Sequence, residues 1–316
     1  MAAIASDSAP PLPGTRPHQS PNRRAWQRFQ RNRPAMISLW FLLALLALII
    51  LWPALSPYNP DALSDAQFQW PSLQHWCGTD VHGRDLLARL MSGARISLLV
   101  GAVGAGVSLV IGVAWGAIAG YVGGRVDGAM MRVVDVLYSL PSIVFVIVLI
   151  TTLEDLVKRV LPEGFLTNTG LSVRLVLLFV GLGAISWLTM ARIVRGQVLS
   201  LRTRSFVDAS RALGASHARI LWRHILPNIY GIIIVYLTLT VPAVILYESF
   251  LSYLGLGIQP PMASWGSLIA EGASQLNPIR IYWWLIVFPG AALVTALLAL
   301  NFLDDDLRDA FDPRAP

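Results

Sequence analysis

The sequence is poor in charged residues. Only 13% of its 316 residues are Asp, Glu, Lys or Arg, against roughly 25% in an ordinary soluble domain. Hydrophobic residues make up 55% of the chain and the mean hydropathy is +0.60, which places the chain among membrane proteins. The net charge of +6 does not indicate nucleic-acid binding, because the basic residues are spread through the loops between apolar runs. We therefore expect no nucleic-acid partner.

Two reactive residue types are almost missing. Cys77 is the only cysteine, so no disulfide can form within the chain. It lies in HWCGTDVHGRD, but Cys77 and His75 lack the paired-ligand spacing of zinc sites, and we expect no metal site. Lys158 is the only lysine and follows Val157. A P-loop needs Gly-Lys-Ser/Thr, so the chain cannot hold ATP in that way, and we predict no catalytic residue.

Long apolar runs without charge account for most of the remaining sequence. Each is near or above the ~17–25 residues that a membrane-spanning helix needs. There are six: Ala35–Leu55, Ile96–Gly124, Val136–Leu153, Leu175–Ala191, Ile225–Tyr247 and Ile281–Leu303. The sequence therefore predicts an all-α membrane protein with six transmembrane helices. The apolar stretch after Glu248, SFLSYLGLGIQPP, is short and closed by Gly and Pro, so we expect an interfacial or re-entrant segment there.

The first apolar run follows a tail that does not look like a signal peptide. Residues 1–34 are rich in Pro and Ser and then basic. No small-residue cleavage pattern closes the run, so we expect a retained first helix. Within the tail, RRAWQRFQRNR is compatible with a basic helix that carries Trp26 and Phe29 on one side. Such a helix would lie on anionic membrane lipids; a solvated tail is the alternative.

The distribution of basic residues predicts the orientation in the membrane. Of the 24 Lys and Arg residues, 17 fall on the side of the termini and 7 on the other side. The positive-inside rule therefore places both termini in the cytoplasm. The predicted segments are a cytoplasmic tail 1–34, a first transmembrane helix 35–56, an external segment 57–94, a five-helix core 95–303 with a cytoplasmic loop 196–228, and a cytoplasmic tail 304–316.

The cytoplasmic loop contains a polar, helix-like segment, FVDASRALGASHARILWRHILPN. Phe206–Leu213 is compatible with a helix, and Gly214 can adopt the left-handed conformation that ends one. Ser216 can cap a second helix, and Pro227 either ends that helix or opens the next span. The residues alone leave two interpretations open: a docking knob for a partner, or an ordinary amphipathic loop at the membrane surface.

The same segment resembles the EAA loop of ABC-importer permeases. That pattern is Glu-Ala-Ala, three residues, Gly, nine residues, then Ile-x-Leu-Pro; here DASRALG is followed by nine residues and HILP. The chain departs from it at Asp208, Ser210 and His224. The stretch GTDVHGRDLLARLMSGARISLLVG resembles peptide and nickel permeases, and WLTMARIVRGQVLSL, ESFLSYLGLG and LRDAFDP resemble the C subunits of oligopeptide permeases. The usual Gly-Asp-Gly before the last motif is replaced by three Asp residues at 304–306; since Asp tolerates left-handed backbone, we expect a turn there.

The resemblance implies a function as well as a fold. It implies the type I ABC-importer permease fold and one half of an ATP-driven oligopeptide channel in the bacterial inner membrane. It implies as partners a homologous permease subunit in a heterodimer, two ABC ATPase subunits, an external peptide-binding protein and membrane lipids. ATP and Mg would sit on the ATPase subunits, and no cofactor on this chain. It assigns the ATPase-coupling loop to Asp208, Ala209, Ser210, Gly214, Leu226 and Pro227.

Three alternatives stay open at this point. An importer of the same fold for dipeptides, nickel or glutathione would share these motifs. A secondary transporter driven by an ion gradient would predict ionisable residues in mid-span and often internal repeats, whereas the spans are nearly free of charge. A membrane scaffold would leave the loop without an ATPase.

Small residues recur at every fourth position of the second span. They place five small side chains on one helical stripe, which allows another helix to approach closely; the general glycine richness of transmembrane helices is the alternative. The neighbouring helix can belong to this chain or to the partner permease. The stripe consists of Gly104, Ser108, Gly112, Gly116 and Gly120.

Two charged features of the spans suggest roles. Glu248 lies near the outer end of the fifth span, where a buried carboxylate is costly. It is a candidate contact for a peptide's amino terminus; alternatively it reaches external water or caps a local fold. Arg132 and Asp135 are three residues apart, which predicts a local ion pair on one helix.

Overall fold

The computed structural model describes residues 29–30, 32–160 and 173–311. These residues form a helical bundle whose only β pairing is an isolated bridge between Thr79 and Asp85. Five helices in this part of the chain are long and apolar enough to cross a membrane, or six spans if one bent pair counts as a span. They are α2 (Arg33–Leu55), α3 (Leu86–Val122), α6 (Val173–Leu201), α9 (Leu226–Tyr253) and α11 (Trp284–Phe311). The predicted all-α membrane class is confirmed.

The third predicted span, Val136–Leu153, is not one continuous helix. The chain forms α4 (Gly124–Ser139) and α5 (Ser142–Val160), which are bent by 92° at their junction. Leu140 is extended, with φ −81° and ψ 138°, and Pro141 follows it. A proline disfavours helical backbone at the residue before it. A window free of charged residues does not detect such a bend.

The second span begins earlier than its charge-free window. α3 starts at Leu86 because the Asp85 side chain caps it, accepting a hydrogen bond from the Ala88 amide at 2.8 Å. The charge-free window begins only after Arg95, which is exposed, whereas Arg89 in the first turn is only 1% exposed and lies inside the structure. Both arginines belong to the helix, and Arg89 is buried by its neighbours.

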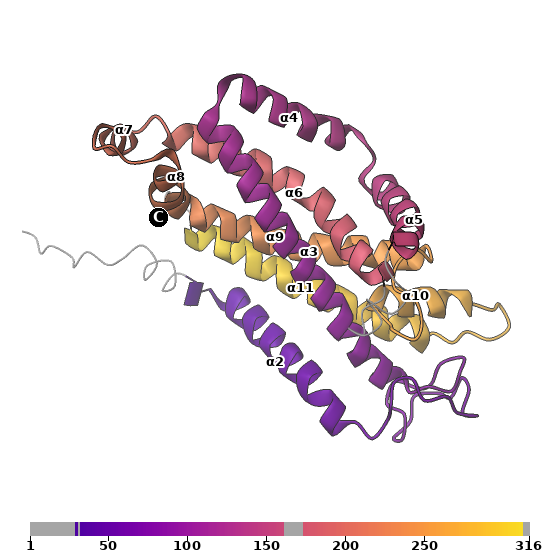
Figure 1. Ribbon diagram of the computed structural model, residues 1–316. Helices are drawn as coiled ribbons and strands as arrows, with labels where there is room; N and C mark the ends of the chain where they lie inside the picture. Colours follow the sequence, from indigo (N-terminus) through magenta and orange to yellow (C-terminus); the bar gives the residue numbers. More distant parts are fainter. Residues whose placement is uncertain (1–28, 31, 161–172, 312–316) are drawn as a thin grey trace, which may run out of the picture.

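The apolar stretch after Glu248 is not a seventh span. α9 continues through it to Tyr253, past the predicted end at Tyr247. The chain then turns and forms the short α10 (Trp265–Ser274). Figure 1 shows α10 at the end of the bundle that also holds the segment between α2 and α3.

The last helix is also longer than expected. α11 runs through the three Asp residues at 304–306 and ends at Phe311, so the turn predicted there was wrong. Asp304 is 1% exposed and accepts a hydrogen bond from Thr238 Oγ1 of α9 at 2.5 Å. The carboxylate therefore joins two helices.

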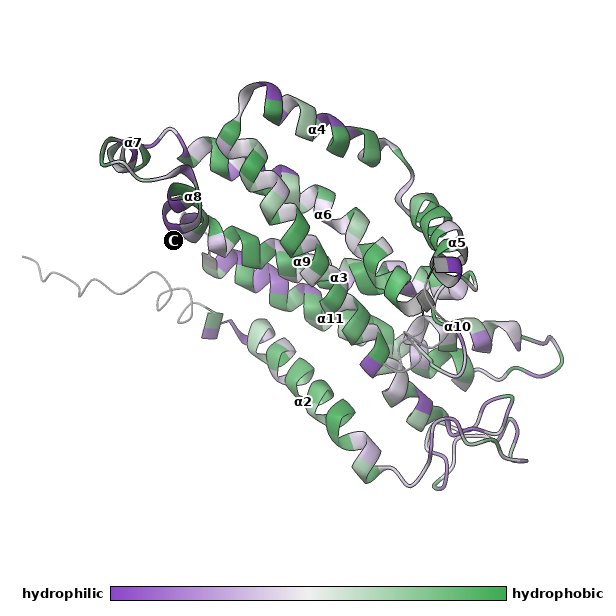
Figure 2. Cartoon of the chain, in the orientation of Figure 1, coloured by the Kyte–Doolittle hydropathy of each residue, from purple (hydrophilic) through white to green (hydrophobic). Residues whose placement is uncertain are grey.

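The end of the bundle opposite α10 contains the polar segment between α6 and α9. α7 (Ser205–Ala212) and α8 (His217–Ile220) lie at one end, together with the start of α2 and the end of α11 (Figure 1). Phe29, Ala35 and Ala310 pack together there. Most of the predicted basic helix of the tail lies outside the described residues. Figure 2 shows mainly hydrophobic residues along α2, and a more polar α8.

Candidate functional site

The polar segment between α6 and α9 begins with a short helix and a sharp turn. α7 ends in a Schellman motif: the Gly214 amide donates to Arg211 O at 2.9 Å, and the Ala215 amide donates to Ser210 O at 3.0 Å. Gly214 has φ +78°, a conformation that glycine adopts without steric cost. The turn predicted at this glycine is confirmed.

The second half of the segment leads directly into a span. Ser216 caps α8, and its Oγ accepts from the Arg219 amide at 3.4 Å. One π-helical turn, η2 (Leu221–Ile225), joins α8 to α9. Pro227 sits in the first turn of α9, where the missing amide hydrogen is not needed. Of the two predicted roles for Pro227, opening the next span is the one observed.

The segment from Ser205 to Leu226 has a buried inner face. It is called the coupling loop here, after the role that the resemblance predicts. Val207, Ile220 and Ile225 are each 0% exposed, and they pack with apolar residues of α6 and α9 such as Val198. Leu226 also faces this cluster, so the structure places it among the anchoring residues and not on the outer surface. The loop is thereby fixed to two spanning helices.

The outer face of the coupling loop is open. Asp208, Ala209 and Gly214 are exposed and Ser210 is partly exposed, so most of the predicted contact residues lie on this face. Asp208 forms an exposed ion pair with Arg211 at 3.2 Å. Large apolar side chains project there as well: Phe206, Leu213 and Trp222 are 38%, 88% and 67% exposed. Exposed large apolar side chains in a polar segment are suited to contact with a partner or with the membrane surface.

A third spanning helix, α3, also contacts the coupling loop. The sequence did not predict this contact. Tyr121, near the end of α3, shares a hydrogen bond of 2.9 Å with His217 Nδ1. Arg202 donates to Tyr121 O at 3.3 Å. These residues, with Asp208 and Arg211, line a hollow of about 770 Å³. Tyr121 and His217 are 96 positions apart, so no local pattern could have paired them.

The small-residue stripe of α3 packs against helices of the same chain. A Cβ added at Gly116 would lie 2.4 Å from Ala191 O, and one at Gly120 would lie 2.7 Å from Arg195 O, both on α6. Gly112 meets Met190 of α6, Gly104 meets Val244 of α9, and Ser108 is completely buried. The structure thus shows that the helices packed on the stripe belong to this chain and not to a partner permease.

Ion pairs connect α4 to α6. Arg195 forms a bidentate pair with Asp127, with distances of 2.5 and 2.7 Å. Asp135 pairs with Arg192 at 2.8 Å. The predicted local pair of Asp135 with Arg132 was wrong, because the α6 guanidinium reaches the carboxylate instead.

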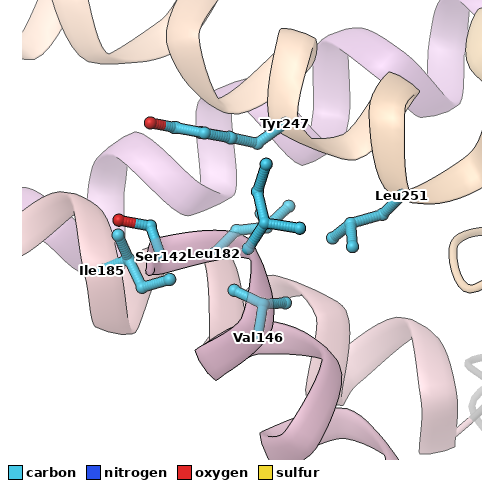
Figure 3. Close-up of a pocket in the computed structure, with 7 residues that line it drawn as sticks. Ser142, Val146, Leu182, Ile185, Tyr247 and Leu251 are labelled. Carbon is cyan, nitrogen blue, oxygen red and sulfur yellow. The ribbon is translucent and has the colours of Figure 1, made fainter. Parts of the chain in front are cut away.

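Glu248 is 0% exposed. Ser252 Oγ donates to its Oε1 at 2.6 Å. The carboxylate therefore faces the interior of the part of the chain that the structure describes. A pocket nearby between α5, α6 and α9 offers no charged partner for a ligand (Figure 3): its lining residues are Ser142, Ile143, Val146, Leu182, Ile185, Tyr247 and Leu251.

The stretch that resembled a metal site is occupied by other contacts. His75 Nδ1 lies 2.9 Å from Asp85 Oδ1. Cys77 is buried, and burial, together with the nearby Asp85 carboxylate, raises the pKa of its thiol to about 11. Among the described residues, no group of three or more His, Cys, Asp or Glu side chains is arranged to hold a metal ion.

Comparison with known proteins agrees with this architecture. Residues 112–315 match the family described as binding-protein-dependent transport system inner membrane component. Residues 20–74 match the N-terminal TM domain of oligopeptide transport permease C. The inward-facing MetNI methionine ABC transporter shares the fold, with a TM-score of 0.52 at 20% identity over 71% of this chain and 97% of that chain. The predicted type I ABC-importer permease fold is confirmed.

Three relatives are similar to this chain over nearly its whole length. The oligopeptide transport system permease protein OppC of Haemophilus influenzae is 42% identical, covering 94% of this chain and 91% of the relative. OppC of Escherichia coli is 43% identical, covering 92% of each chain. The dipeptide transport system permease protein DppC of Bacillus subtilis is 42% identical, covering 95% and 88%. The chain therefore belongs to the family of inner membrane components of binding-protein-dependent transport systems.

Proposed function

We propose that the chain is a permease subunit of an ATP-driven importer for oligopeptides. The observation that carries this proposal is the 42–43% identity to peptide permeases along more than nine tenths of the chain. A dipeptide permease matches as well as the oligopeptide permeases do, so dipeptides are the second candidate substrate. Nickel and glutathione are further substrates that the sequence motifs allow, and no feature of the described residues favours them.

We further propose that the coupling loop lies in the cytoplasm. It lies at the same end of the bundle as the start of α2 and the end of α11 (Figure 1). The basic residues are concentrated at this end, and the positive-inside rule then orients the whole chain. Both termini are cytoplasmic in this orientation, and α10 faces the outside.

The coupling loop is suited to transmit force from an ATPase subunit. Its exposed face offers Asp208, Ala209 and Gly214 to a partner, while its buried face is packed onto α6 and α9. Tyr121 and His217 add a connection to α3. A rigid element held by a moving partner on one side and by three spans on the other can bias the conformation of the path.

In this proposal the chain itself performs no chemistry. Two ABC ATPase subunits bind ATP and Mg and dock below the coupling loop. A homologous permease subunit supplies the other half of the path, and an external peptide-binding protein delivers the substrate. The chain contributes the membrane path and the mechanical connection.

The proposal can be tested by purifying the tagged chain with its neighbours. Gly214→Pro removes the donor to Arg211 O and cannot adopt φ +78°. Gly255→Pro is a matched control, because Gly255 also has a positive φ of 76° and donates to Ser252 O, but lies beyond the other end of α9. We expect the wild type and Gly255→Pro to retain the ATPase subunits and Gly214→Pro to lose them.

The other outcomes are equally informative. If the wild-type chain carries no ATPase under conditions that keep its other partners bound, ATP coupling is wrong and the ion-driven or scaffold alternatives gain support. If Gly214→Pro and Gly255→Pro both keep the ATPases, the importer proposal stands and the coupling loop is not the contact.

A further inference from the structure

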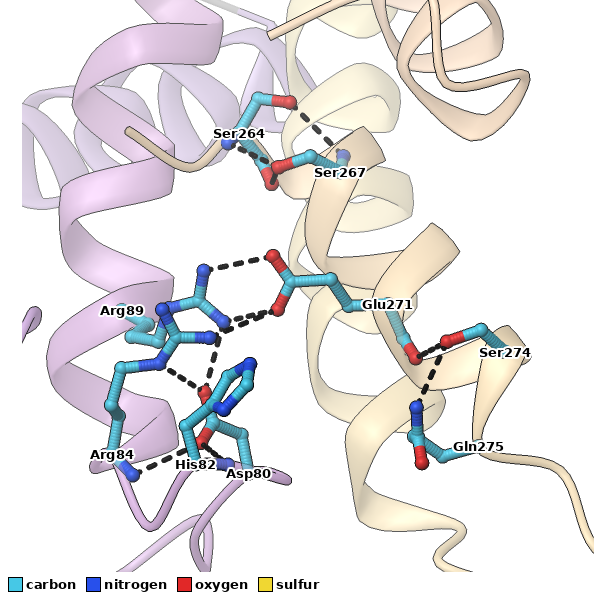
Figure 4. Close-up of polar contacts among 9 residues, drawn as sticks. All are labelled: Asp80, His82, Arg84, Arg89, Ser264, Ser267, Glu271, Ser274 and Gln275. Carbon is cyan, nitrogen blue, oxygen red and sulfur yellow. Dashed lines mark hydrogen bonds and ion pairs between the residues drawn. The ribbon is translucent and has the colours of Figure 1, made fainter. Parts of the chain in front are cut away.

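Four charged side chains form a network at the end of α3 away from the coupling loop (Figure 4). Arg84 Nε lies 2.7 Å from Asp80 Oδ2, and Arg89 Nη1 lies 3.0 Å from the same oxygen. Arg89 Nη2 donates to Glu271 Oε1 at 3.0 Å, and Arg84 Nη2 lies 3.4 Å from Glu271 Oε2. Two cations and two carboxylates thus balance. Glu271 belongs to α10, and the other three belong to the segment before α3 and to its first turn.

The four side chains differ in how many further hydrogen bonds hold them and in how deeply they are buried. Asp80 also accepts the backbone amides of His82 and Arg84, at 2.8 and 3.0 Å, so it stays with its own segment. The side chains of Asp80, Arg84 and Arg89 are 6%, 9% and 1% exposed, whereas that of Glu271 is 33% exposed. Glu271 is therefore the member that water reaches, and its side chain links α10 to α3 across 182 positions of sequence.

The first turn of α10 covers the neighbourhood of Glu248. A Cβ added at Gly266 would lie 2.3 Å from the Ser249 Cα, so the two backbones touch. Ser264, the N-cap of α10, has its Oγ 3.5 Å from Ser252 Oγ, and Ser252 in turn donates to Glu248. α10 thus closes over this turn of α9.

The covered carboxylate is incompletely satisfied. Glu248 Oε2 and Ser249 Oγ have no hydrogen-bond partner among the described residues, although both atoms are buried. Leaving a carboxylate oxygen buried without a partner is costly. A buried polar group that lacks a partner calls for an explanation, and exposure of Glu248 in another conformation would supply one.

We propose that Glu271 is a positioning residue that holds α10 as a closed lid over Glu248. The ion pairs with Arg84 and Arg89 fasten the lid, and the chain is non-helical on both sides of Trp265–Ser274. Opening the lid brings Glu248 and Ser249 into contact with water at the end of the bundle opposite the coupling loop. This inference concerns the conformation of the chain and does not depend on which substrate is carried.

The test measures thiol labelling at covered positions in the purified assembly in lipid. Cys77→Ser removes the native thiol, and Glu248→Cys or Ser249→Cys introduces the reporter. Adding Glu271→Gln keeps the shape of the side chain but removes its charge. We expect the labelling rate by a small water-soluble maleimide to rise about tenfold at both reporters, the order of effect for the loss of one charge-assisted hydrogen-bonded pair.

Two controls separate the lid from general loosening. Asp65→Asn removes an exposed carboxylate from the segment between α2 and α3, which also holds Asp80, and should leave both labelling rates unchanged. Ala117→Cys reports from a buried site farther along α3 and should stay unreactive in the Glu271→Gln background. If Glu271→Gln does not assemble, Glu271→Asp keeps the charge on a shorter side chain and should produce a smaller increase.

The proposal is overturned by either of two results. Unchanged labelling at Glu248→Cys and Ser249→Cys after the Glu271 substitution would show that the network does not hold α10 closed. An equal rise at Ala117→Cys would show that Glu271 supports the fold as a whole instead of positioning α10.

Discussion

The stripe of small residues on α3 leads to a quantitative prediction about Gly116. A Cβ added here would lie 2.4 Å from Ala191 O, and ordinary contact begins near 3.4 Å. The obstacle is backbone, so it cannot rotate away, and α3 and α6 must separate locally by about 1 Å. Gly106 lies on the same helix and has open space around its own added Cβ, which makes Gly106→Ala the matched control.

The two substitutions should differ in their effect on stability. Overpacking by one methyl group in a tight contact costs about 1–3 kcal/mol. Replacing an unhindered helical glycine by alanine contributes up to about 1 kcal/mol of stability. Because this gain is common to both helical positions, we expect Gly116→Ala to be less stable than Gly106→Ala by about 1–3 kcal/mol, the cost of overpacking.

Thermal unfolding of the two purified variants, followed by tryptophan fluorescence in one lipid or detergent, measures this difference. The Tm should fall for Gly116→Ala and stay level or rise for Gly106→Ala. Equal values of Tm in both variants would refute the reasoning, because the close approach of α3 to α6 would then carry no energetic weight.

Two further predictions concern charge and the thiol. A double-mutant cycle on Asp127 and Arg195 should give a coupling free energy of about 1–3 kcal/mol, because the pair is bidentate and Asp127 is buried. The same cycle on the more exposed pair of Asp135 and Arg192 should give less than about 1 kcal/mol, and the reverse order would contradict the geometry. Cys77, with its pKa raised from 9.0 to about 11, should react with iodoacetamide at pH 8 about 100-fold more slowly in the folded chain than in denaturant. Because the unfolded thiol loses its proton first, the folded chain should lose stability as pH rises from about 9 to about 11, and a Cys77→Ser variant should lack this contribution.

Several features followed from local sequence alone. The positive φ of Gly214 was predictable, because a glycine after a short polar helix and before a capping serine is a local pattern. The resemblance of DASRALG and HILP to a permease loop indicates the family from local sequence. Pro141 bends one predicted span into α4 and α5. The turn predicted at the Asp residues 304–306 was wrong: α11 continues through them, and Thr238 of α9 donates a hydrogen bond to Asp304.

The sequence by itself determined that the chain is a helical membrane protein with a polar loop between two spans, because length, hydropathy and turn residues act over a few neighbouring positions. Only the tertiary structure decided that the stripe of α3 packs on α6 and α9 of this chain, that Glu248 is buried under α10, and that Arg89 pairs with Glu271. These contacts join residues far apart along the chain, and they depend on how whole helices pack. No pattern confined to one helix contains that information.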